Sequence, residues 1–161
     1  TGFKLRIKKK IKYDEITKVI KSNSNNKSSV FSFPYGTPYN LLANNFNIAG
    51  FVPIIFYDVC SDNYAELQAN YLNDNKPDIF IWINIPYCLN VHEKIFRQGN
   101  ICKQRKIIEW FERVKDTNYE LIGQASNVLV FKLKNNGIPT NYKFFEKKEL
   151  ESNPEKVKIE Y

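Results

Sequence analysis

The chain has 161 residues, of which 43% are hydrophobic and 15% aromatic, and its net charge is +7. This length and apolar content fit one domain with a full core and exclude an intrinsically disordered chain. No window of the sequence approaches the roughly 20 apolar residues that a membrane span requires. The chain begins with Thr-Gly and contains no methionine, which suggests a fragment of a longer protein.

The positive charge lies mostly near the two ends of the chain. A lysine-rich surface in water explains such a charge, and nucleic acid or the phosphates of lipid head groups and glycolipids are the functional alternatives. A nucleic-acid module more often mixes arginine with exposed aromatic residues through its middle. This chain has only four arginines: Arg6, Arg97, Arg105 and Arg113. Nucleic acid is therefore not the expected partner.

The first predicted elements are a basic segment, a helix and a loop. Residues 1–12 are interpreted as a basic leader or linker. Apolar residues at helical spacing then predict a helix near Ile16, and a polar run over 22–29 predicts a loop.

Residues 30–47 form the stretch on which the rest of the fold depends. Its β-branched and aromatic start predicts a buried strand, and Pro34 and Gly36 then predict a tight turn. Thr37 is a good N-cap, and Pro38 lies where proline fits best, at the first helical position. A strand that ends at a helix N-terminus is the first half of a βαβ unit.

The middle of the chain predicts another helix between two strand regions. Residues 48–59 indicate a strand region interrupted by Gly50 and Pro53. A helix then begins at Ser61 or Asp62, and its predicted apolar face consists of Tyr64, Leu67, Tyr71 and Leu72. The continuous apolar run 79–83 is typical of a strand inside a parallel sheet that helices cover on both faces.

The last third predicts a loop, a helix and a hairpin. Residues 84–100 are interpreted as irregular, and 104–117 as a helix. Strands over 119–122 and 128–133 flank a hairpin turn. We therefore predict an α/β fold: a three-layer sandwich of a mainly parallel sheet, helices on both faces and a C-terminal antiparallel hairpin. The domain covers 13–134, and residues 135–161 are a charged C-terminal extension.

The cysteines and the single histidine limit the chemistry that is expected. Cys88 and Cys102 flank a loop-like stretch, so either they form a disulfide in an oxidising compartment or they are packed thiols like Cys60. The chain has no Cys-x-x-Cys, and His92 has no second histidine to complete a two-histidine site. We expect no metal and no cofactor, and we assign no catalytic residue.

The turn between the first strand and its helix is the most site-like element. A helix N-terminus at the carboxyl end of a parallel strand offers backbone N–H groups to an anion. Aromatic rings with a polar tip can also stack on sugars. The alternative is a strand-to-helix corner held together by aromatic packing. The candidate ligand-binding residues are Tyr35, Gly36, Thr37, Tyr39 and Tyr57.

Several segments in this order resemble one known family. They are Val30–Tyr39 (VFSFPYGTPY), Asn75–Trp82 (NKPDIFIW), Ile107–Phe111 (IIEWF), Tyr119–Ile122 (YELI) and Val128–Phe131 (VLVF). Over roughly 13–134 the chain is similar to the soluble C-terminal domain of multi-spanning GT-C class glycosyltransferases. These are the enzymes similar to dolichyl-phosphate-mannose protein mannosyltransferases and lipid A aminoarabinose transferases.

The resemblance implies a function for the whole protein and a supporting role for this domain. Such enzymes move a sugar from a polyprenyl-phosphate donor to a lipid, glycan or protein acceptor. Their catalytic acids lie in loops between membrane helices, outside this chain. The resemblance thus implies a non-catalytic domain on the extracytoplasmic face of a membrane, beside its own membrane-spanning region, that assists binding of the acceptor or glycolipid.

Two other classes of protein remain open. One is a free-standing α/β protein-interaction module. The other is a small soluble α/β enzyme that uses Asp58, Asp62 or His92 as acid or base.

Overall fold

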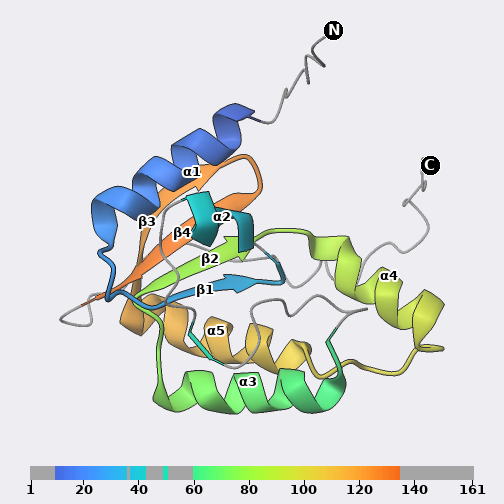
Figure 1. Cartoon of the computed structure of the whole chain (residues 1–161). Helices are drawn as coiled ribbons and strands as arrows, with labels where there is room; N and C mark the ends of the chain where they lie inside the picture. The colour runs from blue at the N-terminus through green and yellow to red at the C-terminus, as the bar shows by residue number, and fades with distance from the viewer. Residues whose placement is uncertain (1–9, 36, 43–48, 51–59, 135–161) are drawn as a thin grey trace, which may run out of the picture.

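The computed structural model describes residues 10–35, 37–42, 49–50 and 60–134 (Figure 1). In chain order its elements are α1 (Lys10–Asn23), β1 (Val30–Phe33), α2 (Thr37–Leu42), α3 (Asp62–Asp74), β2 (Ile79–Ile83), α4 (Pro86–Phe96), α5 (Arg105–Asn118), β3 (Tyr119–Ala125) and β4 (Val128–Leu133). Each helix in this part of the chain is too short or too polar to cross a membrane. The described elements form a mixed α/β fold.

Four strands form one sheet in the order β1-β2-β4-β3. β1 and β2 are parallel neighbours, with Val30 opposite Ile79 and Phe33 opposite Trp82. β4 is antiparallel to both β2 and β3. The predicted C-terminal hairpin is therefore confirmed. The predicted mainly parallel sheet is wrong, because the sheet is mixed and only β1 and β2 pair in parallel among the described strands.

The position of β4 explains why the sheet is mixed. Because β4 is antiparallel to β2 and to β3, these two strands run in the same direction, but β4 lies between them. The first four residues of β4 are all buried, whereas β3 carries the exposed side chains of Glu120 and Gln124. A strand that is apolar on both faces is stabilised at the centre of a sheet, and a half-polar strand is tolerated at its edge. Burial of its apolar side chains thus explains why β4, the second strand of the hairpin, lies inside the sheet and β3 at its edge.

The two faces of the sheet carry different side chains. Successive strand residues point to opposite faces, so β2 directs Phe80 and Trp82 to one face and its isoleucines to the other. The aromatic face packs against α3 and α5, and the aliphatic face packs against α1 (Figure 1). The aromatic cluster is larger and contains residues from all four strands as well as both helices.

Helix α3 begins where the sequence predicts but turns a different face inward. Ser61 is its N-cap. The predicted apolar face is wrong: Tyr64 and Leu67 are more than half exposed, while the buried residues of the helix are Ala65, Gln68, Ala69 and Leu72. The two alanines leave room for close packing, and the Gln68 Nε2 donates a hydrogen bond of 3.1 Å to the Ala49 carbonyl. The buried face of α3 is therefore the one whose small side chains let the helix pack closely, and not the one with the largest apolar side chains.

Helix α4 corrects the expectation that 84–100 is irregular. Pro86 lies in its first turn, where proline is compatible with a helix. Leu89, His92 and Glu93 are buried at helical spacing. Because two of these three residues are polar, the buried face of α4 does not appear as an apolar stripe in the sequence.

Several expectations concern residues outside the described part. These are the basic leader over most of its length, the extension 135–161 and the strand region 48–59 except Ala49 and Gly50. The boundaries of the predicted segments 1–12, 13–134 and 135–161 therefore stay predictions.

The aromatic face supplies the first testable prediction. The Phe80→Ala substitution should lower the free energy of unfolding by about 3–5 kcal/mol, because it removes a fully buried ring and leaves a cavity. Tyr64→Ala is the matched control and should change it by less than about 0.5 kcal/mol, since that ring lies at the surface. Urea unfolding followed by circular dichroism measures both; equal effects would contradict the described core.

Candidate functional site

The predicted corner lies between β1 and the short helix α2. Tyr39 is 3% exposed and packs on Tyr13 of α1, with ring centroids 5.1 Å apart. Burial raises the pKa of the Tyr39 hydroxyl well above its ordinary value, and Tyr13 and Tyr35 raise it further. Its ring therefore joins α2 to α1, and in this structure it presents no free face to a ligand.

Tyr35 is the accessible aromatic residue of this corner among the described residues, with 40% of its surface exposed. Behind it, the Ser32 hydroxyl donates to the Asn40 Oδ1 at 3.2 Å, a buried hydrogen bond that ties β1 to α2. Gly36, Tyr57 and the side chain of Thr37 lie outside the described part. The structure thus places Tyr35 at the surface and Tyr39 in the core, and it does not test the other three candidates.

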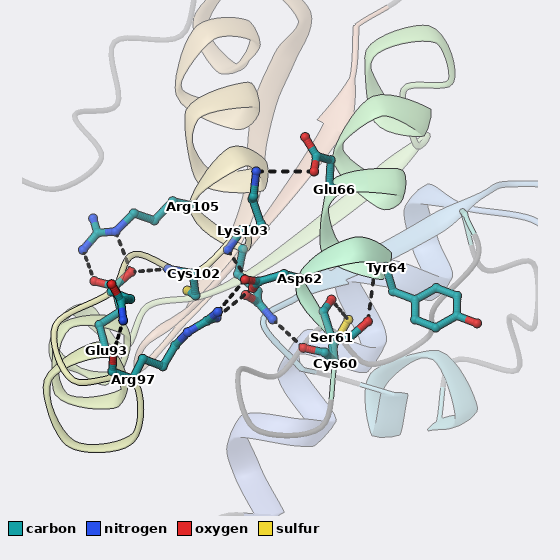
Figure 2. Close-up of polar contacts among 12 residues, drawn as sticks. Cys60, Ser61, Asp62, Tyr64, Glu66, Glu93, Arg97, Cys102, Lys103 and Arg105 are labelled. Carbon is teal, nitrogen blue, oxygen red and sulfur yellow. Dashed lines mark hydrogen bonds and ion pairs between the residues drawn. The ribbon is translucent and has the colours of Figure 1, made fainter.

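A second polar cluster lies where α3, α4 and α5 meet (Figure 2). Here Arg97, just after α4, binds both carboxylate oxygens of Asp62, at 2.7 Å from its Nη1 to Oδ1 and by a second contact from Nη2. The backbone N–H of Lys103 donates to the same carboxylate at 3.1 Å. The first turn of α3 thereby holds both ends of the loop 97–104.

Glu93 of α4 makes a matching arrangement on the other side of this loop (Figure 2). Arg105 donates to its two oxygens, from Nε at 2.8 Å and from Nη2 at 2.6 Å. The backbone N–H of Cys102 donates to Oε1 at 2.9 Å. We call Asp62, Glu93, Arg97 and Arg105 the ion-pair network.

Both carboxylates of the ion-pair network are held in their charged form. The hydrogen bond from Arg97 lowers the pKa of Asp62 against the effect of partial burial. Burial opposes the ionised form of Glu93, but the hydrogen bonds from Arg105 and the Cys102 N–H outweigh it, so the pKa of Glu93 is also below its ordinary value. A general acid at neutral pH needs a raised pKa. Neither carboxylate is therefore suited to act as a general acid, and both hold the loop through its backbone N–H groups.

The remaining candidates for chemistry are dispersed or buried. His92 is mostly buried and its ring lies 5.4 Å from that of Phe96. Asp58 is outside the described part. Within the described ranges, no three His, Cys, Asp or Glu side chains gather as metal ligands would.

Cys60 and Cys102 are buried beside the ion-pair network, and they form no disulfide with each other or with another cysteine whose side chain the structure describes. Burial raises the pKa of both, and for Cys102 the nearby Glu93 adds to the effect and raises it to about 11. The side chain of Cys88 lies outside the described part. The Cys88–Cys102 disulfide consequently stays a prediction.

The sequence did not indicate the importance of Glu93. The structure buries this residue, and Arg105 and the Cys102 N–H bind its carboxylate. The available signal is the helical spacing of Leu89, His92 and Glu93, which are buried together. Asp62 is recognisable from the sequence as a residue at a helix start, but its partner Arg97 is 35 residues away.

Comparison of the chain with protein-family models, curated proteins and solved structures gave no significant match.

The ion-pair network predicts how stability depends on pH. Because the pKa of Glu93 is lower in the folded chain than in the unfolded one, its contribution is fully present above about pH 4.3. It is lost as the pH falls below this value toward the folded pKa. Glu93→Gln should lower the free energy of unfolding by about 1–3 kcal/mol at neutral pH. It should also make the free energy of unfolding depend less on pH in the acid range.

Urea unfolding of both proteins between about pH 3 and pH 7 measures this difference. Glu109→Gln, on the exposed side of α5, is the control and should follow the parent chain. Parallel pH profiles for Glu93→Gln and the parent would contradict the role given to Glu93.

The buried thiols supply a third prediction. Cys60 and Cys102 should resist iodoacetamide near pH 8 in the folded chain, because burial hinders both access and thiolate formation. Both should react in urea with reductant, as mass spectrometry of peptides can show. Omitting the reductant tests the predicted disulfide, since a bridged Cys102 stays unlabelled in urea. Rapid labelling of Cys102 in the folded chain would contradict its described burial.

Proposed function

We propose that this chain is the non-catalytic soluble domain of a multi-spanning glycosyltransferase that uses a polyprenyl-phosphate sugar. In this proposal the domain folds as a three-layer α/β sandwich. It lies on the extracytoplasmic face of the membrane. It assists binding of the acceptor or the glycolipid, beside the membrane-spanning region of the same protein.

One observation carries the proposal: two of the segments on which the resemblance is based lie side by side. Val30 and Ile79 are 49 residues apart in the sequence, yet they are opposite each other in parallel neighbouring strands. Both strands end at the same edge of the sheet, because they are parallel. Ligands of α/β sheets commonly bind outside the carboxyl ends of the strands, and Tyr35 follows β1 at that edge.

The state of the carboxylates supports an assisting role over a catalytic one. Asp62 and Glu93 each bind an arginine and are held ionised. They are therefore poor candidates for the acid of a sugar-transfer step. A domain of this kind contributes through the surface that it offers, and in this proposal that surface includes Tyr35.

The gene gives the first test of the proposal. A run of membrane-spanning segments in the same open reading frame is expected. A complete reading frame that encodes only this domain would exclude the proposal.

The whole enzyme gives the second test. Tyr35→Ala should raise KM for the acceptor or glycolipid several-fold, up to about tenfold, and leave kcat nearly unchanged, because the ring contributes to binding only. Tyr64→Ala, which removes a more exposed ring on α3, should alter neither constant. A loss confined to kcat, or no change for Tyr35→Ala, would contradict the role of this corner.

A protein-interaction module is the second candidate, and one feature of α3 favours it. Tyr64 and Leu67 lie one helical turn apart and point outward, so they offer an apolar surface to a partner. A free-standing reading frame, together with loss of partner binding in Tyr64→Ser/Leu67→Ser, would support this function in place of the first.

A further inference from the structure

The end of α4 and the following loop expose three large apolar side chains. Phe96 is 72% exposed, Ile101 is 69% exposed and Ile95 is 53% exposed. α4 extends to one side of the sheet, away from the strands (Figure 1). We call Lys94, Ile95, Phe96 and Ile101 the α4 tip.

The scaffold beneath the α4 tip is firmly held. Arg97 binds Asp62 on α3, and the backbone N–H groups of Cys102 and Lys103 donate to Glu93 and Asp62 (Figure 2). The Gly99 N–H also donates to the Glu93 carbonyl at 2.9 Å. Phe96 and Ile101 flank these anchor points in the sequence. Hydrogen bonds therefore already hold the backbone that carries the two exposed side chains. Binding a partner then costs little conformational entropy of this backbone.

The charge around the α4 tip is positive. Residues 94–106 contain five lysines and arginines and no carboxylate. Asp62, Glu66 and Glu93 from neighbouring segments pair with four of these cations. Lys94, directly beside Ile95, has no ion pair among the described residues, so cations outnumber carboxylates on this surface.

We propose that the α4 tip is a membrane-docking site that binds the surface of an anionic lipid bilayer. Exposed aliphatic and aromatic side chains bordered by lysine are the combination that enters the boundary between head groups and acyl chains. The cation beside them is attracted by the lipid phosphates. This inference goes beyond the proposed function and does not depend on it, because it concerns a surface distant in sequence from Tyr35.

Two other occupants fit this surface less well. A second copy of the chain would bring two positive patches together, and three side chains fall short of the roughly 800 Å² per partner that a stable interface buries. Nucleic acid would be attracted by the charge, but the aliphatic Ile95 and Ile101 cannot stack on bases as aromatic rings do. Acyl chains suit all three apolar side chains.

The experiment uses the whole chain and vesicles of phosphatidylglycerol mixed with phosphatidylcholine. Phe96→Trp introduces a fluorescent reporter at the α4 tip, and Trp82 and Trp110 give a constant background because both are buried. The reporter should shift to the blue and be quenched by brominated acyl chains. Tyr64→Trp is the matched control at an exposed position on α3 and should remain in water.

Sedimentation with the same vesicles measures binding. Phe96→Ser/Ile101→Ser should weaken partitioning at least about tenfold, because burial of these side chains stabilises the bound state. Tyr64→Ser/Leu67→Ser should bind like the parent chain. The basic segment 1–12 adds attraction equally to all variants, so the comparison isolates the α4 tip.

Three results would overturn the proposal. The first is unchanged vesicle binding by Phe96→Ser/Ile101→Ser. The second is a reporter at position 96 that stays in water while the chain is bound, which would assign the binding to charge alone. The third is a dimer in light scattering that Phe96→Ser/Ile101→Ser dissociates, which would assign the surface to a second copy.

Discussion

The stacking of Phe80 on Phe111 joins the central strand β2 to helix α5, with the two ring centroids 4.0 Å apart. Trp82 stacks on the same Phe111 ring, and Tyr119 packs against it at the start of β3. Burial of these rings removes a large apolar area from water, which is the main stabilising contribution in a domain of this size. The rest of the fold depends on this contact, because it fixes α5 across one face of the sheet and so determines where the loop before α5 must run.

The ion-pair network is a consequence of that placement. Once α5 lies against β2, its first residue, Arg105, meets Glu93 of α4, and the loop before it meets Asp62 of α3. Removing one partner of such a partly buried pair lowers stability strongly, because the remaining charge is left without its partner. Replacing the whole pair by apolar residues would cost less. The network therefore specifies one position of the loop. In the proposed function its carboxylates are structural, and the surfaces that remain for binding are the Tyr35 corner and the α4 tip.

Sequence periodicity predicted the elements whose burial is simple. β1, β2, the C-terminal hairpin and α5 lie where their apolar patterns place them, since each buries apolar side chains at strand or helix spacing. α4 was not predicted because its buried face includes His92 and Glu93, and Arg105, which binds Glu93, is 12 residues away in the sequence. The candidate site was only partly predictable for a related reason: nothing in the sequence shows that Tyr39 is covered by Tyr13 while Tyr35 stays exposed.

The sequence by itself determined the apolar strands, the Ser61 cap of α3 and the C-terminal hairpin, because these depend on spacing within a few residues. Only the tertiary structure decided that β4 lies between β2 and β3, that Asp62 and Glu93 bind Arg97 and Arg105, and that Phe96 and Ile101 face water. Each of these depends on contacts between residues far apart in the chain, and local preference carries no information about which distant residue will be the neighbour.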